Sequence, residues 1–172
     1  MVVSPQRLTR WPSYVRDRHA AITYTTPRDA PGCTEDDVVA ATAALAPSIE
    51  LIDTRITDWK IALCDTIADN ASSAGFVLGE ARVPPRDLDA KAIDTVLTRN
   101  GEVVAEGRGD AVLGNPVTAV AWLARKVESF GVRLRKGDIV LPGSCTRAID
   151  ARPGDEFVAE FSGLGSVRLS FE

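Results

Sequence analysis

Closely spaced turn signals divide residues 92–172 into short runs, and this spacing constrains the fold more than any other feature. Asn100-Gly101 lies between two β-rich runs, 92–99 and 102–108, and is typical of a type I′ hairpin turn. Further glycine-containing turns separate runs that are expected to be strands, at residues 139–141, 156–161 and 166–171. The pattern predicts sheets that are largely antiparallel or mixed.

Two helices interrupt the strands. Thr34 precedes three acidic residues, and this favours a helix start because threonine caps helices and carboxylates suit the positive end of the helix dipole. Pro47 is expected to end that helix. Asn115-Pro116 begins a second helix, which Gly131 ends. Strands are also expected at 47–56 and 74–78, so the fold class is α+β.

Length, charge and cysteine content limit the classes of function. A chain of 172 residues fits one domain, and its net charge of −4 argues against nucleic acid or an anionic membrane as a partner. Cys33, Cys64 and Cys145 are far apart in the sequence, which is typical of reduced thiols, so we expect a cytoplasmic protein. We find no apolar run that predicts a signal peptide or a membrane span.

Common catalytic and cofactor motifs are absent from the sequence. It has no dinucleotide-binding glycine motif, P-loop, nucleophile elbow or paired-histidine zinc motif, and its single histidine is His19. Glu50 is flanked by apolar residues in an expected strand, so its carboxylate needs a cation or hydrogen-bond donors unless that face meets solvent. Residues 58–79 place several polar groups in an apolar segment, which makes this stretch a candidate site.

Three blocks of the sequence resemble a known enzyme family. They read PSIELIDTRITDWKIALCDTIADNASSAGFVLG (47–79), GNPVTAVAWLARKVESFGVRLRKGDIVLPGS (114–144) and PGDEFVAEFSGLGSVRLSFE (153–172). The chain is similar to the 2-keto-4-pentenoate (2-hydroxypenta-2,4-dienoate) hydratases and the related 4-oxalocrotonate decarboxylases of the fumarylacetoacetate hydrolase superfamily. The resemblance implies a mixed-β roll of the fumarylacetoacetate hydrolase C-terminal-domain type with flanking helices, here over residues 34–172. Residues 1–33 are expected to be an irregular segment with room for a short strand at 19–24.

The resemblance also implies a reaction and a cofactor. Family hydratases add water to a 2-hydroxy-2,4-dienoate to give a 4-hydroxy-2-oxo acid in the meta-cleavage catabolism of aromatic hydrocarbons. A divalent cation, Mg²⁺ or Mn²⁺, chelates the 2-oxo and carboxylate oxygens and stabilises the enolate on either side of water addition. Such an enzyme is a lyase, and members of the family are expected to be oligomers.

Particular residues of this chain match functional positions of the family. Glu50 matches a metal-binding carboxylate, and Asn70 and Ser72 match residues that face the site. Lys60 and Asp69 lie in matched blocks and are further catalytic candidates, although taken alone Lys60 is more typical of a solvated lysine. Ser144 is the candidate substrate-binding residue, because it matches a loop that is expected to close over the acid end of the substrate.

The N-terminal part departs from the family pattern. In the family, two further metal ligands form a Glu-x-Glu pair on one strand. The matching positions in this chain are His19 and Ala21, and residues 1–34 contain no glutamate. His19 is therefore the candidate second metal ligand, although an imidazole with one carboxylate suits a softer metal better than Mg²⁺. The acid–base Gly-x-Lys-x-Gly motif of the family has no counterpart in residues 1–33, which predicts a truncated or altered N-terminus.

Three alternatives to a hydratase follow from these observations. The first is a metal-dependent 2-oxo-enedioate decarboxylase or an acylpyruvate hydrolase on the same scaffold. The second is a non-catalytic homologue that serves as a small-molecule binder or as a partner subunit, in a homo-oligomer or in a hetero-complex with a related chain. The third is a nucleic-acid-binding arm formed by the four arginines between Arg7 and Arg18, which is the least favoured.

Overall fold

The computed structural model describes residues 14–24 and 32–172, and for residues 14–24 it describes the backbone alone. The α-helices are α1 (Glu35–Ala41), α2 (Leu63–Ala68) and α3 (Pro116–Glu128). The strands are β1 (Tyr14–Tyr24), β2 (Thr42–Ile52), β3 (Ser73–Leu78), β4 (Asp94–Arg99), β5 (Glu102–Arg108), β6 (Ile139–Val140), β7 (Ile149–Asp150), β8 (Glu156–Phe161) and β9 (Gly165–Ser170).

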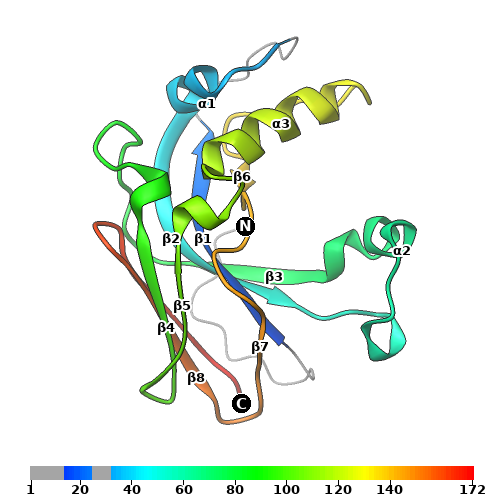
Figure 1. The fold of residues 1–172 in the computed structure, drawn as a ribbon, viewed down its shortest axis with the longest axis vertical. Coiled ribbons are helices and arrows are strands. Elements are labelled where there is room, and N and C mark those ends of the chain that lie inside the picture. The colour runs from blue at the N-terminus through cyan, green and yellow to red at the C-terminus, as the bar shows by residue number, and fades with distance from the viewer. Residues whose placement is uncertain (1–13, 25–31) are drawn as a thin grey trace.

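These strands form two antiparallel sheets (Figure 1). The first has the order β3-β2-β1-β6, and β7 pairs with another part of β1. The second is a four-stranded sheet of order β5-β4-β8-β9. The α+β class is confirmed, and the pairings between the described strands are all antiparallel rather than mixed.

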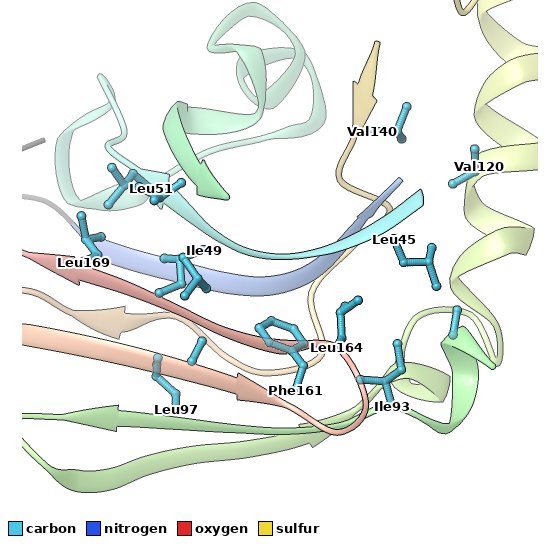
Figure 2. Close-up of a cluster of buried hydrophobic side chains, with 14 of the residues drawn as sticks. Leu45, Ile49, Leu51, Ile93, Leu97, Val120, Val140, Phe161, Leu164 and Leu169 are labelled. Atoms are coloured by element: carbon cyan, nitrogen blue, oxygen red, sulfur yellow. The ribbon is translucent and has the colours of Figure 1, made fainter. Parts of the chain in front are cut away.

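The hydrophobic core lies between the sheets, where β2 packs against β8 and β9 (Figure 2). Leu45 and Ile49 of β2 are almost fully buried there, because alternate residues of a strand point to the same face. The second sheet and its turns contribute the larger side chains, which are Leu97, Phe157, Phe161, Leu164 and Leu169. Helix α3 adds Val117, Val120 and Ala121, as their helical spacing predicted.

Local turn and capping signals predicted the second half of the chain well. Asn100 and Gly101 have φ values of 53° and 84°, as a type I′ turn requires, and they connect β4 to β5. The Asn115 side chain accepts a hydrogen bond from the Val117 backbone N–H at 3.1 Å and caps α3, with Pro116 in the first turn. The hairpin of β8 and β9 closes the fold as expected.

The first predicted helix is shorter than expected. Its start at Thr34 is confirmed, but it ends at Ala41, and Leu45 and Pro47 belong to β2. The backbone from Thr42 onward pairs with β1, so long-range sheet hydrogen bonds outweigh the local helical spacing. Pro47 has no N–H to donate, yet its carbonyl accepts a bond from Gly79 N at 2.8 Å.

The N-terminal strand also differs from expectation. Residues 1–33 were expected to be irregular with a short strand at 19–24, whereas Tyr14–Tyr24 form an 11-residue strand. β1 lies inside the first sheet, between β2 on one side and β6 and β7 on the other. The description of this stretch as irregular was therefore wrong, while the domain boundary at residue 33 stays a prediction.

None of the helices in the described ranges is long and apolar enough to cross a membrane.

Candidate functional site

Glu50 lies on β2, on the face opposite to the inter-sheet core. Its neighbour Ile49 is buried in that core, and successive residues of a strand point to opposite faces. Glu50 is half-buried. Its register partners are Phe76 in β3 and, at the backbone level, Arg16 in β1. The carboxylate is thus on the side of the sheet where a site could be built without disturbing the core.

The second predicted metal ligand, His19, is close to Glu50 in register. The backbone of His19 pairs with Ser48, which is two residues before Glu50 in β2. The His19 side chain lies outside the described part of the structure. Among the residues that the structure describes, no group of three histidine, cysteine or acidic side chains could hold a metal ion. These residues alone therefore do not form the all-oxygen cage that Mg²⁺ prefers.

The segment between β2 and β3 carries four of the predicted catalytic residues and projects away from the two sheets (Figure 1). It includes α2 and returns to the sheet where the Asp53 backbone N–H donates to the Ser72 carbonyl at 2.9 Å. That bond brings the end of β2 next to the start of β3. Asp69, Asn70 and Ser72 therefore lie at the base of the projection, beside the strand that carries Glu50.

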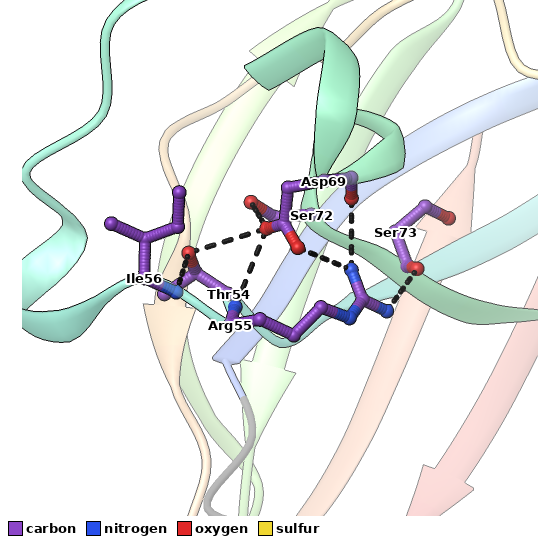
Figure 3. Close-up of polar contacts among 6 residues, drawn as sticks. All are labelled: Thr54, Arg55, Ile56, Asp69, Ser72 and Ser73. Carbon is purple, nitrogen blue, oxygen red and sulfur yellow. Dashed lines mark hydrogen bonds and ion pairs between the residues drawn. The ribbon is translucent and has the colours of Figure 1, made fainter. Parts of the chain in front are cut away.

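Asp69 is the centre of a buried polar cluster (Figure 3). Its side chain is 4% exposed, and its Oδ1 accepts from Arg55 Nη1 at 2.9 Å. Its Oδ2 accepts from the Ser72 hydroxyl at 2.8 Å, from the Arg55 backbone N–H at 3.3 Å and from the Thr54 hydroxyl at 3.4 Å. Arg55 also donates to the carbonyls of Asp69 and Ser73. Both carboxylate oxygens are thus occupied.

These contacts change the acidity of Asp69. The hydrogen bond from the Arg55 guanidinium lowers the pKa of the Asp69 carboxyl below its ordinary value, and the Ser72 hydroxyl lowers it further, whereas burial opposes the shift. Hydrogen bonds to a charged carboxylate favour the ionised form. Asp69 is consequently a carboxylate at neutral pH, and this arrangement suits a residue that holds neighbouring groups in place better than one that donates a proton.

Three consecutive residues after Asp69 have left-handed backbone conformations. Asn70, Ala71 and Ser72 have φ values of 53°, 56° and 58°. Such values cost a non-glycine residue roughly 1–2 kcal/mol and persist when surrounding contacts determine them. Here the Ser72 hydroxyl binds Asp69, and the Ser72 N–H donates to the Asp69 carbonyl at 2.9 Å. The cluster therefore fixes a turn on which Asn70 is exposed.

Lys60 and Ser144 lie apart from this cluster. Lys60 Nζ is 3.1 Å from Asp58 Oδ2, and both side chains are largely exposed, so solvent screens the pair. The Ser144 hydroxyl bonds within its own loop, donating to the Thr146 carbonyl and accepting from the Thr146 N–H at 3.0 Å. Among the described residues, no hydrogen bond joins either of them to Asp69.

Sequence reasoning missed Arg55 as a member of the site. The sequence identified Asp69 and Ser72 as candidates and indicated that buried polar groups in this segment need partners. It did not identify Arg55 as the partner of Asp69. The available signal was the position of Arg55, which lies near the end of the expected strand 47–56 and precedes the polar segment. A buried carboxylate needs a nearby cation, and Arg55 is one of two cations, with Lys60, between residues 50 and 80.

Comparison with known proteins shows which proteins this chain is similar to. The chain is 47% identical over 135 residues to a 2-keto-4-pentenoate hydratase of Paraburkholderia phymatum, a match that covers 78% of this chain and 52% of that protein. It is 37% identical over 151 residues to a 4-oxalocrotonate decarboxylase of Pseudomonas putida, covering 88% of this chain and 57% of the other. The chain thus spans about half the length of the curated relatives it matches.

A solved structure has the same fold. The 4-oxalocrotonate decarboxylase from Pseudomonas putida G7, complexed with magnesium and adipate, superimposes with a TM-score of 0.89 at 34% identity, over 93% of this chain and 60% of that one. The fumarylacetoacetate (FAA) hydrolase C-terminal family matches residues 9–172, which include β1 as well as the later blocks. With its two antiparallel sheets and this match over nearly its whole length, the chain belongs to the fumarylacetoacetate hydrolase C-terminal family.

Proposed function

We propose that this chain takes part in the hydration of a 2-hydroxy-2,4-dienoate to a 4-hydroxy-2-oxo acid in the meta-cleavage catabolism of aromatic compounds. The observation that carries the proposal is the 47% identity to a 2-keto-4-pentenoate hydratase over 78% of the chain. In the proposed reaction the dienol ketonises to a conjugated enone, and water then adds at C4. Small-molecule 2-oxo acids or dienols are the expected substrates.

A second candidate is decarboxylation of a 2-oxo-enedioate. The TM-score of 0.89 with a 4-oxalocrotonate decarboxylase favours it, because that enzyme has the same fold and similar sequence blocks. The two reactions share an enolate of a 2-oxo acid as the species to be stabilised, and they differ in whether water is added or carbon dioxide is lost. Product analysis therefore separates them.

Glu50 is our candidate ligand for a divalent cation, Mg²⁺ or Mn²⁺, with His19 as the candidate second ligand. The family relative with magnesium bound supports a cation. One carboxylate and one imidazole are fewer hard ligands than Mg²⁺ prefers, so we expect weak binding with a preference for Mn²⁺. If a partner chain supplies further ligands, as in the expected homo-oligomer or hetero-complex, binding tightens only in that assembly.

The residues at the base of the projecting segment have different proposed roles. The exposed Asn70 amide is available to hydrogen-bond a substrate or the attacking water, and the cluster of Asp69 and Ser72 positions it. Lys60 is proposed as a catalytic cation that would exchange its weak contact with Asp58 for a substrate carboxylate. Ser144 is proposed to contact the acid end of the substrate.

The activity test uses the full chain with 2-hydroxypenta-2,4-dienoate and MgCl₂ or MnCl₂. We expect loss of the dienol ultraviolet band and formation of the 4-hydroxy-2-oxo acid, identified by NMR. We expect Glu50→Gln to lower the rate at least tenfold, and Asp87→Asn, which removes an exposed carboxylate paired with Arg86, to leave it unchanged. A rate equal to the blank with either metal contradicts the proposed activity.

Calorimetric titration with Mn²⁺ distinguishes an enzyme from a non-catalytic homologue. Binding of one ion per chain that disappears in Glu50→Gln supports the metal-dependent enzyme. Absence of both binding and turnover supports the non-catalytic homologue. Release of carbon dioxide from a 2-oxo-enedioate, without hydration of the dienoate, would favour the decarboxylase instead.

A further inference from the structure

A cavity of about 410 Å³ is lined by residues of β4, β5 and β7 and of the segment that leads into β7. Its lining residues are Arg99, Val104, Arg147, Ala148, Ile149 and Asp150. None of these is among the candidate site residues. Because β7 borders β1 on the side away from β2, one strand lies between β7 and the strand that carries Glu50.

Arg99 enters the cavity from the core-facing side of the second sheet. It is the last residue of β4 and shares a face with Thr95 and Leu97, which are both buried. Arg99 is itself half-buried, and its Nη1 donates to the Asp150 carbonyl at 3.3 Å. That bond orients the guanidinium and leaves most of its five N–H donors available.

Arg147 comes from a loop that is packed firmly on β5. A Cβ at Gly107 would meet the Cys145 carbonyl oxygen and would lie 2.7 Å from Thr146 Cγ2, so only glycine allows the loop to sit this close. The Ser144 hydroxyl accepts from the Thr146 N–H at 3.0 Å and tightens the loop. The backbone that carries Arg147 is therefore held beside Arg99 before any ligand arrives.

The described lining of the cavity carries more positive than negative charge. Within the described part of the chain, neither Arg99 nor Arg147 forms an ion pair with a carboxylate. Among the lining residues that the structure describes, Asp150 is the single acidic side chain, against two guanidiniums. A half-buried guanidinium is stabilised by an oxyanion that accepts two parallel N–H bonds, as carboxylates and phosphates do.

We propose that this cavity, the Arg99–Arg147 pocket, binds the carboxylate or phosphate group of a small organic anion. Val104 and Ile149 supply apolar walls for the carbon skeleton, and the two guanidiniums supply the donors. The site is separate from the face that carries Glu50, so it holds an anionic ligand whether or not the proposed hydratase activity is present. The two oxyanion classes share this recognition chemistry, and the experiment compares them.

The test is an NMR titration of the full chain, freed of divalent cations on a chelating resin, with inorganic phosphate in one series and succinate in another. Removing the cations excludes binding through a metal ion and leaves no competing carboxylate in solution. We expect saturable shifts of the backbone amides of residues 99 and 147–150 with at least one probe, with millimolar or tighter affinity. A tighter response to succinate assigns a carboxylate ligand, and a tighter response to phosphate assigns a phosphate ligand.

Substitutions locate the site. We expect Arg147→Gln, at an exposed position, to weaken binding at least tenfold without lowering the unfolding midpoint, and Arg147→Lys to retain part of it as a point charge. Arg99→Gln should also weaken binding at least tenfold. Arg86→Gln removes an exposed arginine paired with Asp87 elsewhere on the surface, and it should bind like the parent chain.

The outcomes separate this proposal from the proposed function. Glu50→Gln should bind the probe unchanged even where it abolishes turnover. Absence of saturable shifts at tens of millimolar of both probes would overturn the proposal. Shifts confined to other residues, or equal affinities in the parent, Arg147→Gln and Arg99→Gln, would overturn it as well.

Discussion

Asp69 shows how a single residue can be decisive for a local structure. Its carboxylate accepts bonds from three side chains and one backbone N–H that flank a left-handed turn, so its charge stabilises the arrangement of residues 54–73. An uncharged amide in its place offers one acceptor oxygen and introduces an NH₂ group that faces donors. Aspartate is a residue type that can transfer protons, but the contacts of Asp69 suit it to the role of a fixed hydrogen-bond acceptor.

The first prediction concerns the pH dependence of stability. Because the pKa of Asp69 is lowered in the folded chain, its stabilising contribution is complete above its unfolded pKa of about 3.9 and is lost as the pH falls through the folded pKa. We expect Asp69→Asn to lower the urea midpoint at pH 7 and to approach the parent as the pH falls through the folded pKa of Asp69. Urea unfolding curves from neutral to acid pH measure the difference.

Asp58→Asn is the matched control for this prediction. Asp58 also contacts one cation, Lys60, but the pair is exposed and screened by solvent. We expect it to follow the parent curve across the pH range. A difference between Asp69→Asn and the parent that stays constant from neutral to acid pH would show that the charge of Asp69 is not what stabilises the turn.

Helix α1 shows how strongly a short element depends on its cap. Thr34 accepts from the Asp37 N–H at 3.2 Å, and the Asp37 carboxylate accepts from the Thr34 N–H at 3.1 Å, which completes a capping box. At seven residues, the helix has few internal hydrogen bonds to compensate for a lost cap. It also presents Glu35 to α3, where the Thr118 hydroxyl donates to it at 2.5 Å.

Removing this cap is the second prediction. We expect Thr34→Ala to lower the free energy of unfolding by about 1 kcal/mol, because the N–H of Asp37 loses its acceptor. Chemical denaturation with far-ultraviolet circular dichroism measures the change. Thr57→Ala, at an exposed position outside the sheets and α-helices, should stay within about 0.5 kcal/mol of the parent. Equal values for the two variants would contradict the capping role.

Elements defined by local chemistry could be predicted from the sequence, and those defined by distant partners could not. The Asn100-Gly101 turn and the Asn115 cap depend on neighbouring residues, and both were predicted. The end of α1 was not, because the backbone after Ala41 pairs with a strand some twenty residues earlier in the chain. No local periodicity carries that information.

The same limit applies to the site. The resemblance of residues 47–79 identified Glu50, Asp69 and Ser72 as candidates, but the partner Arg55 is defined by the way the projecting segment folds back on the end of β2. Whether Lys60 and Ser144 join them on binding substrate is a property of the whole active protein, and their roles stay predictions.

At the scale of the whole molecule, the two sheets meet closely beside Gly79. A Cβ at this position would lie 2.6 Å from Pro47 Cγ and would also meet the backbone carbonyl of Ser166 in β9. The Gly79 N–H donates to the Pro47 carbonyl, so the backbone cannot move away without losing that bond. This position therefore sets how closely the edge of the first sheet approaches the second.

The third prediction tests this contact between the sheets. We expect Gly79→Ala to lower the free energy of unfolding by about 1–3 kcal/mol, because the added methyl group overpacks two backbone segments. Gly75→Ala is the control, since nothing lies within 4 Å of a Cβ built there, and it should raise stability by up to about 1 kcal/mol because glycine within a strand is less stable than alanine. Thermal and urea denaturation measure both. If Gly79→Ala is as stable as Gly75→Ala, the close approach does not constrain the sheets.

The pairing of β1 has a consequence for how the protein matures on the ribosome. β1 hydrogen-bonds not only to β2 but also to Ile139–Val140 and Ile149–Asp150, which are translated more than a hundred residues later. The hydrogen bonds of its outer edge therefore form only after residues 139–150 have been translated, and contacts of such long sequence separation form slowly. We therefore expect folding during synthesis to depend on chaperones, because the outer edge of β1 stays exposed until β6 and β7 have been made.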